Sequence, residues 1–541
     1  MTLLLGTMCL PVIVAILGIT VDLSVMYSIK TRLQMACDGA AVAALRSLNL
    51  GQTIASQTAS ATTVAQQWFT ANFAGNFMGA QNTSAPTIVV TQSNTSFVTT
   101  VDVSAVTYSP SYFMKYYSFG ATRIGATSEA SRRNVVITLV LDRSGSMQPG
   151  GASAYAGSPC ETMVNDAKQF TGAFQEGRDY VGLVTFGETV NVGSPPTQNF
   201  QTVLGYTNGN GTSAGLLDNV RCSGGTNTSS GLAVGWNLNY ETALPGALNV
   251  IVLFTDGTPT ASTFSFVTNA ATDPYGTAHN VLSLASSTCT DSAGKAMKSG
   301  GDMLANPRDW TGVREATNGS APYSVGFGAG SYWPSVSGPV GALYGDGTSF
   351  YGVDLWYQPG TINGIPANEN AWKNSTEAPG CGFNNPSIPP GDNPTSTPDV
   401  AFIPPTDVWG NLITGYVSLP DGNVIVQGVS RTKLDLNNLT NVHYNTTDNM
   451  ANFIRTTNPG TATFPGTLIY AIGLGSNGGV DSALLQRVAN DPNPCPICSP
   501  ALGAYAANTS QPTGKYVYSP NANDLSAAFA TIASQIIRIS R

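Results

Sequence analysis

The stretch Val135–Met147, which reads VVITLVLDRSGSM, decides the fold of this chain. Its first part is a nearly unbroken apolar and β-branched run, the composition of a strand buried on both faces of a parallel sheet. The run ends in Asp-x-Ser-x-Ser, so Asp142, Ser144 and Ser146 follow the carboxyl end of that strand. Ligands of open α/β sheets bind in the crevice outside such strand ends. The stretch therefore predicts an α/β fold with a polar site at one edge of its sheet.

These three side chains offer a carboxylate and two hydroxyls on alternate residues of a tight loop. Hard oxygen donors without thiolate or imidazole suit Mg²⁺, Mn²⁺ or Ca²⁺ better than zinc or copper. The alternative for this motif taken alone is a Ser/Gly turn that only ends a strand. Two later stretches favour the metal: SGGTN at 223–227 precedes a helix-like segment, and the buried apolar run Asn249–Phe254 ends in Thr255-Asp256-Gly257.

DRSGSM, GGT and FTDG, in this order and spacing, resemble the metal-ion-dependent adhesion site of von Willebrand factor A domains. The resemblance implies a doubly wound, mainly parallel α/β sheet. It also implies five metal ligands, some of them through water: Asp142, Ser144, Ser146, Thr226 and Asp256. Because only two of the five are charged, we expect one divalent cation, Mg²⁺ in preference to Ca²⁺ or Mn²⁺. One coordination position would be left for the carboxylate of a protein partner.

The composition is that of an exported protein with several domains. A chain of 541 residues is too long for one core, so two to four domains are expected. Charged residues make up only 10% of the chain, against about 25% in ordinary globular proteins. A net charge of −8 with 23 Lys plus Arg argues against nucleic-acid binding. Two histidines, His279 and His443, leave little material for His-based catalysis or a zinc site.

The amino terminus predicts a membrane helix. Thr2–Val21 contains no charged residue and is about long enough to span a bilayer. Helix-forming residues continue to Leu45, which favours one helix of roughly 45 residues. The block VDLSVMYSIKTRLQMACDGAAVAAL at 21–45 resembles the amino-terminal segment of TadG-like proteins of the Tad (Flp) pilus assembly system. This resemblance implies a pseudopilin-like membrane helix with an exported body, and other pilus or pseudopilin subunits as partners.

Two signals disagree about topology. Lys30, Arg32 and Arg46 all follow the apolar span, and the positive-inside tendency would keep that side in the cytoplasm. The cysteine usage, the charge-poor body and the Tad resemblance place the same side outside. We expect the amino terminus inside and everything after about residue 30 outside, anchored in the inner membrane of a bacterial cell envelope.

The expected segments are a membrane and extended helix at 1–49, a small α+β pseudopilin-like unit at 50–133, and a von Willebrand-like domain at 134–262 and 443–541, with an insertion at 263–442. The domain is divided because IYAIGLG at 469–475 and DLSAAFATIASQI at 524–536 resemble the last strand and helix of that family. The α+β unit is either a head that docks with assembly partners or a spacer. We expect short strands and ordered turns in the insertion. Its aromatic residues form either a sugar- or peptide-binding platform or the core of a loop-rich module.

Six cysteines lie beyond the amino-terminal helix: Cys160, Cys222, Cys289, Cys381, Cys495 and Cys498. An even number in an exported body indicates disulfides, with fifteen possible connectivities. We expect Cys160 to pair with Cys222, because Cys160 begins the helix after the first metal loop and Cys222 lies four residues before Thr226. A local disulfide between Cys495 and Cys498 is favoured over a redox or zinc pair, since no second CxxC exists.

Two further motifs are similar to motifs found in enzymes. GTSAG at 211–215 fits a nucleophile elbow around Ser213, but the polar YTNGN before it stands where a buried strand is required. GLGSNG at 473–478 fits a dinucleotide fingerprint, yet no second βαβ strand with an acidic residue follows.

We therefore expect no enzyme but a membrane-anchored, exported, metal-dependent interaction or adhesion component of a Tad-type pilus machine. The alternative is a surface or secreted adhesin that binds a host, matrix or glycan ligand independently of a pilus. A third class, a hydrolase using Ser213, would keep its activity without the metal.

Overall fold

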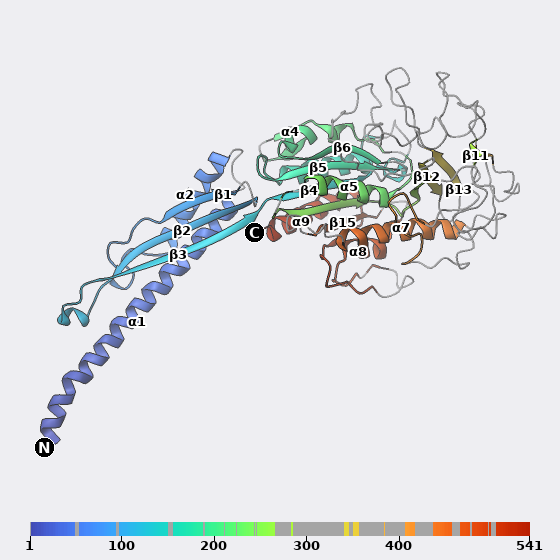
Figure 1. The fold of residues 1–541 in the computed structure, drawn as a ribbon. Coiled ribbons are helices and arrows are strands. Elements are labelled where there is room, and N and C mark those ends of the chain that lie inside the picture. The colour runs from blue at the N-terminus through green and yellow to red at the C-terminus, as the bar shows by residue number, and fades with distance from the viewer. Residues whose placement is uncertain are drawn as a thin grey trace.

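The computed structural model consists of a long stalk unit (residues 2–133) followed by a larger sheet domain (residues 134–540), as Figure 1 shows. The structure describes residues 2–48, 54–93, 97–149, 155–187, 190–265, 283–284, 340–345, 350–355, 383–384, 406–416, 436–456, 466–475, 479–498 and 505–540, apart from 210, 223, 243, 245 and 496.

The stalk unit is built on helix α1 (Thr2–Ser47), a single helix of 46 residues. Helix α2 (Ile54–Asn72) and an antiparallel sheet of order β1-β2-β3 pack against its carboxyl-terminal half (Figure 1). The strands are β1 (Thr87–Gln92), β2 (Val98–Ser109) and β3 (Thr122–Arg133). Ala36, Ala40 and Ala44 lie on one face of α1 and are fully buried in this contact. Among the residues that the structure describes, no helix holds a stretch both long and apolar enough to cross a membrane.

The sheet domain contains a six-stranded sheet of order β16-β15-β9-β4-β5-β6. Its strands are β4 (Val135–Asp142), β5 (Tyr180–Phe186), β6 (Val190–Thr197), β9 (Leu248–Thr255), β15 (Leu468–Leu474) and β16 (Tyr516–Ser519). All neighbouring strands are parallel except β6, which runs antiparallel to β5. The predicted α/β fold with a mainly parallel sheet is confirmed, and one edge of the sheet is antiparallel.

Helices cover both faces of this sheet (Figure 1). On one face lie α3 (Pro159–Gly172) and α9 (Leu525–Ile539), and on the other α5 (Thr228–Thr242), α7 (Leu436–Thr456) and α8 (Ser482–Ala489). Successive side chains of a strand point to opposite faces. Leu139 and Leu141 of β4 therefore join the core beneath α3 and α9, while Val140 joins the core beneath α5.

The strand order reverses between β4 and β9. From β4 the chain moves outward through β5 to β6, and it then returns to the other side of β4 as β9, followed by β15 and β16. Such a switch point opens a crevice outside the carboxyl ends of the two central strands. The residues that follow β4 and β9 therefore face each other across this crevice.

Two elements of the sheet domain differ from the sequence-based expectation. Hydrophobic periodicity predicts a helix over 447–455. In the structure α7 begins at Leu436, within the range expected as insertion. Polar residues of its first half, such as His443 and Asn445, are fully buried, so hydrophobic periodicity does not reveal them. Strand β6 is not expected either, because it contains Pro195 and Pro196, which a sheet tolerates at its edge.

The insertion contributes a three-stranded antiparallel sheet of order β10-β12-β13. These strands are β10 (Ala261–Ser265), β12 (Val340–Gly345) and β13 (Phe350–Leu355), and β11 (Ser283–Leu284) pairs with β14 (Phe383–Asn384). Cys289, Cys381 and most of the aromatic residues of the insertion lie outside the described residues.

The stalk unit and the sheet domain meet at a buried ion cluster. Asp179, which precedes β5, accepts a hydrogen bond from Nη2 of Arg178 at 2.7 Å, and Nη2 of Arg132 on β3 lies 3.8 Å from its Oδ2. All three residues are almost fully buried. Burial alone would raise the pKa of the Asp179 carboxyl, but the two guanidinium groups hold it below its usual value. The Arg178 guanidinium also donates to the carbonyl of Leu48, so the cluster ties the end of α1 to the sheet domain.

We expect Asp179→Asn to lower the free energy of unfolding by about 3–5 kcal/mol, because it leaves two buried guanidinium groups without their shared anion. Chemical denaturation of the full chain measures this loss. Glu129→Gln is the matched control, since Glu129 is exposed on the same strand as Arg132 and should change stability by less than about 0.5 kcal/mol. Equal effects of the two substitutions would contradict a stabilising role for the cluster.

Candidate metal centre

Asp142 ends β4 with its carboxylate fully buried. Its Oδ1 accepts a hydrogen bond from the backbone N–H of Ser144 at 2.7 Å, and its Oδ2 accepts one from Oγ1 of Thr255 at 2.5 Å. The first bond folds the loop back over the end of the strand, and the second joins the ends of β4 and β9. The Asp142 carboxylate is therefore held in one position by both central strands.

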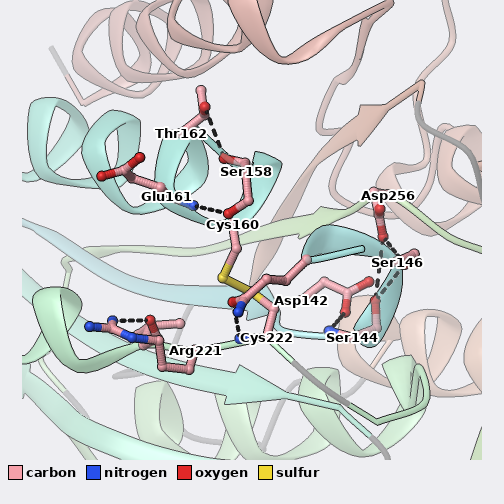
Figure 2. Close-up of a disulfide and its surroundings, with 12 residues drawn as sticks. Asp142, Ser144, Ser146, Ser158, Cys160, Glu161, Thr162, Arg221, Cys222 and Asp256 are labelled. Atoms are coloured by element: carbon pink, nitrogen blue, oxygen red, sulfur yellow. Dashed lines mark hydrogen bonds between the residues drawn. A yellow bond between two sulfur atoms is a disulfide. The ribbon is translucent and has the colours of Figure 1, made fainter. Parts of the chain in front are cut away.

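Asp256 follows β9 and is also fully buried. Oγ of Ser146 donates to its Oδ1 at 2.7 Å, Oγ of Ser144 lies 3.4 Å from the same oxygen, and the two serine hydroxyls are 3.0 Å apart. Figure 2 shows these side chains converging at the end of the sheet. The structure thus brings together four of the five side chains that the sequence predicts as ligands.

Thr226, the fifth predicted ligand, lies just before α5. A Cβ built on Gly257 would lie 3.6 Å from Oγ1 of Thr226 and 3.9 Å from Oγ of Ser146, so both hydroxyls border the same small space. The backbone of Thr226 is fixed by Thr260, whose Oγ1 accepts its N–H at 3.0 Å and whose own N–H donates to its carbonyl at 3.0 Å. All five predicted residues therefore lie at one edge of the sheet.

Two glycines of α5 bring this third loop close to the sheet. A Cβ on Gly235 would lie 2.6 Å from Cγ2 of Val140, and one on Gly231 would lie 2.8 Å from Cδ1 of Phe186. Real side chains do not reach such short distances, so α5 can pack this closely only with glycine at both positions. The close packing places the amino-terminal end of α5, and Thr226 before it, beside the ends of β4 and β9.

The electrostatics of the site favour a cation. Burial, and then the negative charge of Asp256, raise the pKa of the Asp142 carboxyl to about 7, although hydrogen bonds from Thr255 and Ser144 oppose the shift. A divalent cation between the carboxylates would remove this repulsion, and hydroxyl oxygens are suitable additional donors for a hard cation. In the described part of the chain no group of three or more His, Cys, Asp and Glu side chains could hold a metal, so a cation here would depend on the hydroxyls. The donor set fits Mg²⁺, Ca²⁺ or Mn²⁺.

A disulfide lies beside the site (Figure 2). The structure joins Cys160, at the start of α3, to Cys222, which is 62 positions later in the sequence, with 6.1 Å between their Cα atoms. The backbone N–H of Cys222 donates to Oε1 of Gln148 at 3.3 Å, so the bridge also contacts the loop that follows β4. Cys495 and Cys498 form a second disulfide, while Cys37 is a buried free thiol on α1.

Thr255 is a site residue that sequence reasoning missed. In the sequence it stands beside the predicted ligand Asp256, but in the structure its hydroxyl donates to the Asp142 carboxylate. The sequence feature that could have indicated this role is the position of Thr255 in its strand. As the last residue of a fully buried strand, it is a polar side chain that requires a partner.

Ser213 has no nucleophile-elbow geometry. It ends the short strand β8 (Gly211–Ser213), which pairs only with β7 (Tyr206–Asn208), and its Oγ donates to the carbonyl of Ala214 at 3.3 Å. Of the two histidines, His443 is fully buried on α7 with its Nδ1 2.8 Å from Oγ of Ser262, and His279 lies outside the described residues.

Two family models match the chain. Residues 137–258 match the von Willebrand factor type A domain, and residues 1–60 match the Flp pilus-assembly TadE/G-like family. The chain joins a Tad-type amino terminus to a von Willebrand factor type A domain. The resemblances to the von Willebrand factor A family and to the Tad pilus-assembly family are confirmed, and the sheet domain is from here on termed the VWA domain.

Solved structures of pilus proteins also match, at low identity. The pilus adhesin SpaC from Lactobacillus rhamnosus GG, in its open conformation, is 15% identical, with 84% of this chain and 34% of that chain covered and a TM-score of 0.30. The PilB minor pilin from Streptococcus sanguinis is 12% identical, with 86% and 80% covered and a TM-score of 0.29. The vWF domain of the type V pili tip protein Mfa5 from Porphyromonas gingivalis is 14% identical, with 76% and 98% covered and a TM-score of 0.30.

The match to this chain thus covers 34% of the length of SpaC, about a third. A comparison with curated proteins returns no match.

Without divalent cations, we expect the stability of the protein to fall as the pH rises from about 5 to about 8. The pKa of Asp142 in the folded protein is about 7, against about 3.9 in an unfolded chain. The folded state therefore binds more protons than the unfolded state across this window, and the free energy of unfolding decreases with pH. Excess Mg²⁺ should reverse the loss at high pH, because a cation binds the ionised carboxylate.

Thermal melts in EDTA and in Mg²⁺ at both pH values measure this effect. Asp142→Asn is the control, because it removes the titrating group and should flatten the pH dependence seen in EDTA. The explanation is wrong if wild type and Asp142→Asn lose the same stability between the two pH values.

Proposed function

We propose that this protein is an exported, membrane-anchored and metal-dependent interaction or adhesion component of a Tad/Flp-type pilus machine, without enzymatic activity. The observation on which the proposal depends is the pair of fully buried carboxylates, Asp142 and Asp256, at the switch point of the VWA sheet. Two like charges enclosed with hydroxyl groups support a cation site, because a cation would relieve the repulsion between the carboxylates. The match of residues 1–60 to the TadE/G-like family supports the pilus context.

The proposed cation is held by Asp142, Ser144, Ser146, Thr226 and Asp256, directly or through water. The two carboxylates balance its charge, and the hydroxyls leave it a strong attraction for further anionic oxygen. A cation held by these residues would attract a further anionic oxygen, and a carboxylate of a protein partner is the natural group to supply it. Mg²⁺ is the preferred candidate because it seldom has all of its ligands from one protein chain.

The disulfide between Cys160 and Cys222 supports export, because such bonds persist in oxidising compartments. Membrane anchoring is proposed on the charge-free sequence Thr2–Val21. The proposal includes the division of the chain into an amino-terminal helix, a small α+β unit that raises the VWA domain above the membrane, and an insertion within that domain.

We expect Asp142→Ala to reduce Mg²⁺ affinity by more than the roughly 10–100-fold that loss of an outer-shell partner causes, because it removes a charged ligand. Isothermal titration of the full chain with Mg²⁺ measures this change. Ser213→Ala is the control and should bind Mg²⁺ like wild type, since Ser213 lies on the β7–β8 hairpin. Equal Mg²⁺ affinity of wild type and Asp142→Ala would refute the proposed site.

The same two variants in cells separate the pilus from the adhesin alternative. Loss of pili with Asp142→Ala, counted by electron microscopy, supports a role in the pilus machine. Normal pili with reduced attachment of cells support an adhesin that acts independently of pilus assembly. Loss of pili or of attachment with Ser213→Ala alone would favour the hydrolase hypothesis.

We expect protease added to spheroplasts to degrade the VWA domain and to leave only an amino-terminal fragment, because the proposed topology places residues after about 30 outside. Immunoblotting with an antibody against the VWA domain measures the loss. A cytoplasmic protein probed on the same blot shows that the spheroplasts are intact. Full protection of the VWA domain would mean that the positive-inside tendency of Lys30, Arg32 and Arg46 determines the topology.

A further inference from the structure

The loop between β2 and β3, residues 110–120, is an exposed aromatic surface. Five of its residues are aromatic and at least 43% exposed: Tyr112, Phe113, Tyr116, Tyr117 and Phe119. Its one charged residue is Lys115, which is also exposed. A cluster of exposed aromatic side chains this dense marks an interaction site in a soluble domain or contact with a membrane.

Asp22 of α1 holds this loop. Its buried carboxylate accepts hydrogen bonds from three consecutive backbone N–H groups: Tyr112 at 2.9 Å, Phe113 at 3.0 Å and Met114 at 2.7 Å. Gly18, one turn earlier on the same face of α1, leaves room for Phe113, whose Cβ would lie 2.7 Å from a Cβ at that position. The loop is therefore fixed to α1 at the level of residues 18–22.

The rest of α1 at this level is apolar and exposed: Ile13, Ile16, Leu17, Ile19, Val21 and Leu23 are each at least 41% exposed. At about 100° per residue they spread over roughly 200° of the helix circumference, and Gly18 and Asp22 lie on the remaining side. The loop thus covers the one side of the helix that carries a charge. An uncovered apolar surface this wide needs a nonpolar environment.

We propose that the loop 110–120 lies in the membrane–water interface and, held by Asp22, sets the depth at which α1 leaves the bilayer. This inference rests on the proposed membrane anchoring. The twenty residues Thr2–Val21 rise about 30 Å as a helix, which equals the hydrocarbon thickness of a bilayer. Asp22, the first charged residue of the chain, and the loop bound to it therefore lie at the outer boundary of the hydrocarbon.

The chemistry of the loop suits that boundary. Tyrosine combines an apolar ring with a polar hydroxyl and is enriched at both interfaces of membrane proteins. Lys115 can extend its ammonium group toward lipid phosphates while its methylene chain stays among apolar groups. The Asp22 carboxylate has its hydrogen bonds satisfied by the loop, so it can lie at a depth where a free carboxylate would be costly.

Depth-dependent quenching tests this placement. The full chain carrying Tyr116→Trp is reconstituted into vesicles of phosphatidylcholine and phosphatidylglycerol whose acyl chains are brominated either near the headgroup or near the methyl end. We expect the emission added by Tyr116→Trp, relative to wild type, to be quenched mainly by the headgroup-proximal bromine. Tyr240→Trp on α5, at a position that is 40% exposed in the VWA domain, is the matched control and should not be quenched.

Asp22→Ala in the Tyr116→Trp background tests the role of the carboxylate. We expect loss of the preference for headgroup-proximal bromine, because the loop is no longer fixed to α1. An unchanged quenching profile would show that Asp22 does not set the position of the loop.

Flotation of the same vesicles in a density gradient tests membrane anchoring separately from the interfacial position of the loop. Protein that fails to float overturns membrane anchoring and, with it, the interfacial loop. Protein that floats while the Tyr116→Trp emission remains unquenched overturns the interfacial loop alone and favours a contact between the loop and another protein.

Discussion

The proposed metal centre depends on the enclosure of two carboxylates at the ends of adjacent parallel strands. Because β4 and β9 are neighbours and run in the same direction, the residues that follow them must meet at one edge of the sheet. Both strands are buried along their whole length, so the carboxylates of Asp142 and Asp256 are removed from bulk water as well as brought together. The free-energy cost of burying these two negative charges is lowered by protonation or by a bound cation. The surrounding hydroxyl oxygens, which can act as metal ligands, favour the cation.

The surrounding structure limits how far the site can relax. Without a cation, two repelling carboxylates would move apart if their loops were free. The Thr255 hydroxyl holds Asp142 at the end of β9, and the bridge between Cys160 and Cys222 joins the start of α3 to the chain that leads into Thr226. The glycines of α5 bring that chain close to β4. These contacts hold the oxygen ligands in place before a cation binds. Binding of a cation would therefore not need to offset the entropy cost of ordering the loops.

Contiguous motifs made much of the VWA domain predictable from sequence. A buried apolar strand followed by Asp-x-Ser-x-Ser contains its own structural context, and the spacing to GGT and FTDG specified which loops meet. The features that sequence reasoning missed depend on contacts between distant positions. Asp22 and Phe113 are 91 residues apart, so no local pattern reveals that a carboxylate of α1 holds the aromatic loop. Similarly, the partners of Asp179 come from β3 and from the residue beside it, and charge counting could not pair them.

The link between the stalk unit and the VWA domain determines how the two ends of the molecule act on each other. Only Asn134 separates β3 from β4, and its backbone is bonded on both sides: its N–H donates to Phe97 of the stalk unit and its carbonyl accepts from Leu248 of the VWA domain. The N–H of Arg133 also donates to the carbonyl of Ser540 at the end of the chain. A connection of this kind has no free linker residue, unlike the mobile segments that usually join domains. The orientation of the VWA sheet is therefore coupled to that of α1 (Figure 1). A loop that fixes α1 at the membrane surface would also orient the proposed metal site.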